Sequence, residues 1–411
     1  MSFPMSAATS ASLAGAGVAP RTRRVRGTCR GRRHVVTRAS KDETNGLGLL
    51  TWLGPVIPQG ALVTGVKGTW KIAWQTMVTE LAPQSKDGEY RRPKYAFDGK
   101  ISNHANAKHP PRPGWYVLYV GNACPWCHRV TLTIALLGLQ ESITVVKMTD
   151  DAERASRGGW VFETSRPDPV FKTSKDLREV YDAVTQSSYQ GRCTAPLLVD
   201  GVKKIAVNNE SADICAMLDS ANFHVATGDA PSPKNPGTSV ELRPDQLVTE
   251  IDTLNDYLYK KLNNAVYRSG FATTQAAHNR AAQDVVDALD RVDEILGKTR
   301  FLLGDRVTDS DVRLFPTIVR FDAVYASLFK CSSRRVGDLP HLQAWMRDFY
   351  LLPGVKETVD VDGYRSSYFG QLFPLNPGGI VPTGPTKEDL GLGVDPGRGS
   401  LAREDVFYLK Q

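Results

Sequence analysis

The feature that most constrains this chain is the motif Cys124-Pro125-Trp126-Cys127, which directly follows the apolar run at residues 115–120. The run predicts a buried strand, and the proline suits the first position of a helix, where its missing N–H would be unpaired anyway. Cys124 then stands at a helix N-terminus, where free N–H groups and the helix dipole favour an anion. Such placement lowers the pKa of a thiol from about 8.5 toward about 3.5–7.5. The motif therefore predicts that Cys124 is a sulfur nucleophile.

The positive charge of the chain is concentrated at one end. The formal net charge is +7, but residues 1–40 hold eight arginines and no Asp or Glu, which leaves −1 for the remainder. An acid-free, Arg- and Ser-rich segment without an apolar core predicts a transit peptide, with the chloroplast as the destination and the mitochondrion as the alternative. A basic arm that binds nucleic acid is the other interpretation. The charge balance of the remainder predicts no nucleic-acid partner.

Cysteine usage and hydropathy limit the class of protein further. Six cysteines in 411 residues are too few for a dense disulfide framework. No second C-x-x-C pair accompanies the first, so we expect no zinc site and no other metal. No apolar run is long enough to span a bilayer. These observations predict a soluble protein in a reducing compartment.

Hydrophobic patterning divides the chain into segments of different character. Short apolar runs alternate with helical patterns in the first half, which predicts a mixed α/β layer. From residue 245 on, apolar residues recur at helical spacing. Thr308 and Asp311 have the spacing of a capping box at the start of one such helix. The predicted segments are a transit peptide (1–40), an irregular leader (41–98), an α/β domain (99–225), a linker (226–244), an all-helical domain (245–385) and a flexible tail (386–411).

Two further motifs suit a ligand that resembles a peptide. Ala195-Pro196 leads into a predicted strand, and a cis bond there would present the backbone of Ala195 to a ligand. Glu210-Ser211 precedes a predicted helix, whose first N–H groups suit a carboxylate, while Glu210 suits an ammonium group. The γ-glutamyl end of glutathione carries both groups. Helix capping alone also explains Ser211, so a purely structural role stays open.

Taken together, the pattern resembles the glutathione transferase fold, in which a thioredoxin-like α/β domain precedes an all-α domain. Several longer motifs resemble one omega-like subgroup, the glutathionyl-hydroquinone reductases or xi-class glutathione transferases. The resemblance extends over residues 113–385. The motifs that carry it are residues 189–196, 207–211, 264–272, 311–315, 320–325, 329–331 and 376–382.

The resemblance implies a glutathione-dependent reduction of glutathionyl-hydroquinones to hydroquinones, carried out by a homodimer. The family's nucleophile falls on Cys124, which would attack the glutathione sulfur, and a second glutathione would resolve the mixed disulfide. Family tyrosines that donate hydrogen bonds to the hydroquinone fall on Tyr267 and Tyr325. The expected glutathione-binding residues are Trp126, Ala195, Pro196, Glu210 and Ser211.

The chain departs from the family pattern at two places. The family usually has alanine where this chain has Cys127, and its two histidines are missing from residues 363–369. A second thiol favours an alternative, a broader omega- or glutaredoxin-type thiol transferase or dehydroascorbate reductase, in which Cys127 resolves the mixed disulfide. Cys127 as a chemically idle helical residue is the opposite interpretation. A non-catalytic binding module on a transferase fold is the third possibility for the whole chain.

Overall fold

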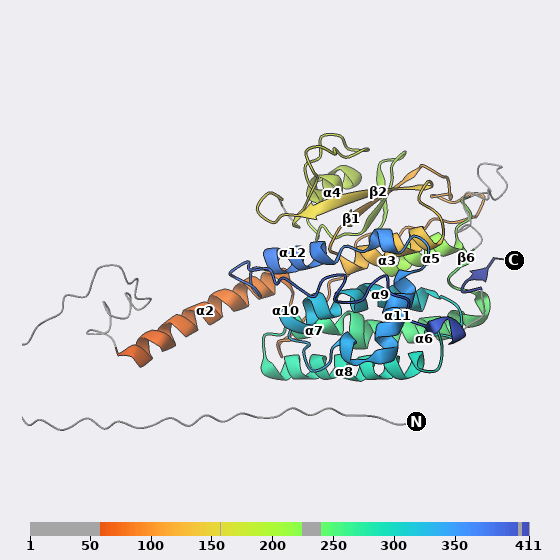
Figure 1. Ribbon diagram of the computed structural model, residues 1–411. Coiled ribbons are helices and arrows are strands. Elements are labelled where there is room, and N and C mark those ends of the chain that lie inside the picture. The colour runs from red at the N-terminus through yellow and green to blue at the C-terminus, as the bar shows by residue number, and fades with distance from the viewer. Residues whose placement is uncertain (1–57, 157, 224–239, 402–404, 411) are drawn as a thin grey trace, which may run out of the picture. The chain divides into compact units, whose positions relative to one another are not determined.

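The computed structural model describes residues 58–156, 158–223, 240–401 and 405–410 (Figure 1). The predicted transit peptide and most of the predicted linker lie outside these residues. The described residues from 66 onward form one compact unit, and the contacts discussed below lie within it. In the part of the chain that the structure describes, no helix is both long and apolar enough to cross a membrane.

The α/β half is built on a mixed sheet with the strand order β3-β2-β1-β4-β5. The central strand β1 (Tyr116–Gly121) is buried along its whole length. It pairs in parallel with β2 (Ile143–Asp150) and antiparallel with β4 (Leu197–Asp200). The edge strands β3 (Trp160–Val161) and β5 (Ile205–Asn208) pair antiparallel with β2 and β4. Because β1 is central, the chain that leaves its end starts the next helix at the middle of the sheet.

Helices cover both faces of this sheet. Figure 1 shows α4 (Leu177–Thr185) on one side of β1 and β2, with α3 (Pro125–Leu136) and α5 (Ser211–Ser220) together on the other. α3 also packs against α9 (Asp309–Arg320), a helix of the second half. α3 therefore lies between the sheet and the helical half, and residues at its start contact both.

The second half is helical, as its spacing of apolar residues predicted. Thr308 caps α9, where the N–H and hydroxyl of Thr308 donate to the Asp311 carboxylate at 3.0 Å each, so the predicted capping box is confirmed. The indole N–H of Trp345 donates to the same carboxylate at 3.1 Å, which ties α11 to the start of α9. The helices besides α9 are α6 (Val248–Leu258), α7 (Ala265–Gly270), α8 (Gln275–Leu296), α10 (Ala326–Leu328), α11 (Pro340–Tyr350) and α12 (Val361–Gln371).

Two π-helical turns interrupt the helices that face α3. They are η3 (Tyr259–Asn263), which follows α6, and η4 (Phe321–Tyr325), which follows α9. A π turn widens the helix by one residue and is frequent at functional sites. Each of them carries or adjoins aromatic side chains of the site described below. The short 3₁₀ helices are η2 (Asp245–Leu247), η5 (Val336–Asp338), η6 (Lys356–Thr358) and η7 (Arg398–Leu401).

Two segments differ from the sequence-based expectation. Residues 41–98 were expected to be irregular, yet they contain the helix α2 (Gln59–Leu81), whose pattern is obscured by glycines at 60, 65 and 68. Residues 386–411 were expected to be a flexible tail, yet β7 (Tyr408–Leu409) pairs with β6 (Val240–Glu241). Arg398 of the same tail is buried and donates to backbone carbonyl groups at the end of α8. These contacts depend on partners distant in sequence, which a local pattern does not reveal.

Candidate active site

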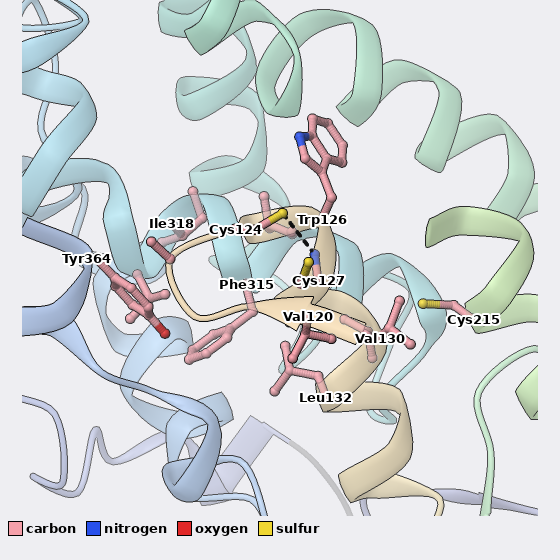
Figure 2. Packing of buried hydrophobic residues seen from close by; sticks show 14 of the residues in the cluster. Val120, Cys124, Trp126, Cys127, Val130, Leu132, Cys215, Phe315, Ile318 and Tyr364 are labelled. Carbon is pink, nitrogen blue, oxygen red and sulfur yellow. Dashed lines mark hydrogen bonds between the residues drawn. The ribbon is translucent and has the colours of Figure 1, made fainter. Parts of the chain in front are cut away.

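Cys124 is the residue that ends the β1–α3 turn and caps α3. Its backbone is extended, and its sulfur accepts the N–H of Cys127 at 3.3 Å (Figure 2). The thiol also lies 3.6 Å from the carbonyl oxygen of Ala195, as a donor to it. The Ala195–Pro196 bond is cis. Cys124 is 8% exposed and is therefore a buried residue.

Opposing effects act on the pKa of Cys124. Burial by itself raises the pKa of this thiol. The hydrogen bonds from the side chain and backbone of Cys127 and the charges of Arg92 and Arg320 outweigh burial and lower the pKa to about 7. A large fraction of Cys124 is therefore thiolate at neutral pH.

Cys127 lies one turn into α3 and is 1% exposed. Its sulfur accepts the N–H of Gly121 at 3.4 Å. Burial and the neighbouring Cys124 raise its pKa well above the usual range, so it remains a neutral thiol. The other described cysteines are buried and form no disulfide with one another or with the pair, and Cys215 lies on α5, apart from the pair (Figure 2). Among the described residues no cluster of His, Cys, Asp or Glu is arranged for a metal ion.

Trp126 connects the thiol to cationic and aromatic side chains. The guanidinium of Arg92 lies over its ring at 3.7 Å, and that of Arg129 at 4.6 Å. The Trp126 ring centroid is 6.0 Å from that of Tyr259 and 6.1 Å from that of Tyr267. Cation–π contacts of this kind hold the indole in one orientation.

Glu210 and Ser211 lie at the start of α5. The Glu210 carboxylate accepts the N–H of Ala212 at 2.9 Å and the Ser211 hydroxyl at 3.2 Å, so it caps its own helix. Glu210 also borders a cavity of about 310 Å³ with charges of both signs. The cavity is lined by Arg129, Glu210, Ala212, Asp252, Asn255, Asp256, Tyr259, Asn263 and Arg313.

Three tyrosine hydroxyls meet on the helical side of the site. The Tyr267 oxygen lies 2.5 Å from that of Tyr368 and 3.4 Å from that of Tyr325, and the Tyr325 and Tyr368 oxygens are 3.3 Å apart. The three residues come from α7, η4 and α12. Burial raises the pKa of all three. The cluster therefore consists of protonated hydroxyls that can donate hydrogen bonds.

Comparisons with known proteins agree with this arrangement. The chain matches the models "Glutathione S-transferase, N-terminal domain" over residues 123–221 and "Glutathione S-transferase, C-terminal domain" over residues 275–348. A glutathionyl-hydroquinone reductase of Sphingobium chlorophenolicum is 38% identical over 80% of this chain and 97% of its own length. Another from Escherichia coli is 34% identical over 79% of this chain and 95% of its own length.

The chain belongs to the family of glutathionyl-hydroquinone reductases and xi-class glutathione transferases. The xi-class transferase of Phanerochaete chrysosporium has a TM-score of 0.66 and 35% identity over 74% of this chain and 94% of its own. The glutathione-bound Escherichia coli homologue has a TM-score of 0.65 and 34% identity over 74% and 96%. The predicted fold class, a thioredoxin-like domain followed by an all-α transferase domain, is confirmed. The protein is an enzyme of this family.

Three residues of the site in this xi-class transferase were not predicted from the sequence. Arg92 lies in the predicted leader and has no local signal that would indicate its contact with Trp126. Tyr368 stands in the segment that departs from the family pattern, and only folding brings it to Tyr267. The sequence does contain a signal that could have indicated Arg320, because this residue is the single cation in the mainly apolar segment 314–324.

The role of Cys127 as a hydrogen-bond donor to Cys124 can be tested with a pair of variants. Cys127→Ala removes the side-chain S–H and keeps the backbone N–H that donates to the Cys124 sulfur. We therefore expect the pKa of Cys124 to rise by about one unit, as for the loss of one hydrogen bond to a charged group. Cys127→Ser keeps a donor and serves as the control, with a shift of a few tenths at most. The measurement is the pH dependence of Cys124 alkylation by iodoacetamide, located by mass spectrometry. If the alkylation midpoint of Cys124 is the same in Cys127→Ala and Cys127→Ser, the Cys127 side chain does not act as a donor to Cys124.

Proposed function

We propose that this enzyme reduces glutathionyl-hydroquinones to hydroquinones with glutathione as cosubstrate, through a Cys124–glutathione mixed disulfide. The observation that carries the proposal is the position of Cys124, a thiol of lowered pKa that shares the site with a cluster of three tyrosine hydroxyls. The names of relatives that are 34–38% identical support the same reaction.

The proposed reaction needs the Cys124 thiolate and one free glutathione, in addition to the glutathionyl group that the conjugate already carries. The Cys124 thiolate attacks the sulfur of the conjugate, an S–S bond forms, and the bond between sulfur and the ring breaks. A second glutathione thiolate attacks the glutathione sulfur of the mixed disulfide, which releases oxidised glutathione and restores Cys124. Two sulfur atoms are oxidised by one electron each, and the ring carbon gains a hydrogen.

The cavity beside Glu210 suits the γ-glutamyl end of glutathione. That end carries an ammonium and a carboxylate, and the cavity offers the carboxylates of Glu210, Asp252 and Asp256 beside the guanidiniums of Arg129 and Arg313. Arg313 is already paired with Asp309 at 2.8 Å. Arg129 has no ion pair among the described residues and is therefore the group that we assign to the carboxylate. Trp126 and the backbone of Ala195 and Pro196 would hold the remainder of the tripeptide.

The nucleophile can be tested by matched thiol variants. We expect Cys124→Ser to lose at least about 1,000-fold in kcat, because a serine hydroxyl is not ionised at neutral pH. We expect Cys127→Ser to keep activity within a few-fold. The assay follows hydroquinone release from a synthetic glutathionyl-hydroquinone. Full activity of Cys124→Ser would overturn the mechanism.

The tyrosine cluster is assigned to the hydroquinone, since phenolic hydroxyls can donate to its ring oxygens. We expect Tyr325→Phe to lower kcat on the hydroquinone conjugate by about 10- to 100-fold, while reduction of a small glutathione mixed disulfide changes little. Tyr350→Phe, a buried tyrosine on α11, is the control. Equal losses on both substrates would place Tyr325 outside hydroquinone recognition.

A second candidate function is a broader thiol transferase or dehydroascorbate reductase that uses both cysteines. The position of Cys127 favours it, because Cys127 follows Cys124 by three residues and its backbone N–H lies 3.3 Å from the Cys124 sulfur, so the two thiols have the spacing of a C-x-x-C pair. In that cycle Cys127 would expel glutathione from Cys124. Loss of turnover in Cys127→Ser, with a Cys124–Cys127 disulfide in the wild type by mass spectrometry, would favour this function over the first.

Two further assignments rest on the sequence and on the resemblance. We propose that residues 1–40 direct the protein to the chloroplast, with the mitochondrion as the alternative, and that it works as a homodimer. A fluorescent fusion to residues 1–40 distinguishes the two organelles, and a diffuse signal would contradict both. Sedimentation equilibrium of residues 41–411 measures the oligomeric state.

A further inference from the structure

Arg320, the last residue of α9, is a fully buried cation that has no anionic partner among the residues the structure describes. Its Nε donates to the carbonyl oxygen of Ala123 at 3.1 Å, and its Nη1 donates to that of Pro316 at 2.9 Å. Its Nη2 has no hydrogen-bond partner in the described part of the chain. Within the same residues no carboxylate forms an ion pair with it, although the other interior arginine of α9, the partly buried Arg313, pairs with Asp309.

His128 is the neighbour that could change the charge at this position, and it is neutral. Arg320 Nη1 lies 2.8 Å from His128 Nδ1, and His128 Nε2 lies 2.9 Å from the Thr358 hydroxyl. That hydroxyl donates to the Val355 carbonyl at 2.7 Å, so the ring proton is on Nε2 and Nδ1 accepts from Arg320. Burial and the charge of Arg320 hold the pKa of His128 well below its usual range.

The remaining contacts of Arg320 are with α12 and with the residue that precedes Cys124. Its guanidinium lies 3.6 Å over the ring of Tyr364, on α12. Its hydrogen bond to Ala123 places it against the residue that precedes Cys124. The titratable and charged groups that face Arg320 or share its surroundings are Cys124, Cys127 and His128 of α3, Tyr267 of α7, Tyr325 of η4, Tyr364 and Tyr368 of α12, Lys147 of β2 and Arg92.

A buried charge is strongly unfavourable unless an opposite charge faces it. None of the groups around Arg320 is a permanent anion, but Cys124 becomes one when it ionises. The charge of Arg320 lowers the pKa of Cys124, and it opposes the effect of burial on the pKa of Tyr325 and Tyr368. Negative charge is therefore favoured both at the sulfur and beside the tyrosine hydroxyls.

We propose that Arg320 is the counter-ion of two successive anions of the reaction, the Cys124 thiolate before attack and the hydroquinone oxygen after the bond to sulfur breaks. The second part rests on the proposed function. The conjugate reacts as its keto tautomer, in which the carbon that bears sulfur also bears hydrogen. When the C–S bond breaks, its electron pair moves onto the adjacent carbonyl oxygen and leaves a hydroquinone monoanion, which then takes a proton.

This role defines the substrates as conjugates whose leaving group can place negative charge on an oxygen next to the broken bond. A purely structural role for Arg320, as a tie between α9 and the β1–α3 turn, would instead affect folding and would affect all substrates equally. The two roles therefore differ in the ionisation of Cys124 and in the choice of substrate.

The first test measures the ionisation of Cys124 in the full chain by the pH dependence of iodoacetamide alkylation. We expect Arg320→Met to raise the midpoint by about one unit, which is about tenfold less thiolate below the midpoint, and Arg320→Lys to stay near the wild type. Arg398→Met is the control, because Arg398 is also buried but binds carbonyl groups at the end of α8. A folded Arg320→Met with the wild-type midpoint overturns the proposal.

The wild type provides a measurement that does not depend on how the variants fold. Arg92 is partly exposed, whereas Arg320 is fully buried. Salt at about 1 M screens exposed charges and leaves buried pairs largely intact. We expect the alkylation midpoint of Cys124 to remain lowered at that salt concentration. A midpoint that returns to the ordinary pKa of a thiol would overturn the proposal.

The second test compares two substrates at a pH above both midpoints, where Cys124 is thiolate in every variant. One is a glutathionyl-hydroquinone and the other is the mixed disulfide of glutathione with 2-mercaptoethanol, whose leaving group is a thiolate. We expect Arg320→Met to lose at least tenfold more kcat on the hydroquinone conjugate. Equal losses overturn the second part of the proposal. If the wild-type enzyme does not act on glutathionyl-hydroquinones, the proposed function is overturned. The alkylation measurement still tests whether Arg320 stabilises the Cys124 thiolate.

Discussion

The site depends on the placement of one sulfur atom at the start of a helix that is held from both sides. Cys124 caps α3 by accepting the N–H of Cys127, and the central strand β1 determines where that helix begins. The energy that favours a thiolate there comes from hydrogen bonds and positive charges, which outweigh the opposing effect of burial. Every other group of the site is useful only in relation to that anion.

The two halves of the protein supply different parts of the chemistry. The α/β half provides the thiol, the cis Ala195–Pro196 edge and the start of α5, which together suit a peptide-like thiol. The helical half provides the tyrosine cluster and Arg320, which suit an oxygen anion. α3 packs against both halves, so a displacement of α9 would move the cation relative to the sulfur. Cys127 adds a neutral thiol whose role decides between a one-thiol and a two-thiol cycle.

Local signals predicted much of the fold and part of the site. The strand–proline–helix pattern around Cys124 and the capping box at Thr308 arise from interactions between residues that are close in sequence, so periodicity and residue type were sufficient. The helix α2 was missed because glycines break its pattern, and the order in the tail was missed because β7 pairs with a strand about 170 residues earlier. Arg92 reaches Trp126 through a fold that no local pattern describes.

The sequence by itself determined the two-domain class and the family, and it predicted Cys124 as the nucleophile, because each of these depends on short motifs and on hydrophobic spacing. Only the tertiary structure decided which groups surround Cys124. It joined Tyr267, Tyr325 and Tyr368 from three helices, and it left Arg320 buried beside them with no carboxylate partner in the described part of the chain. Electrostatic effects in a protein interior depend on distance and burial, and both are properties of the folded chain.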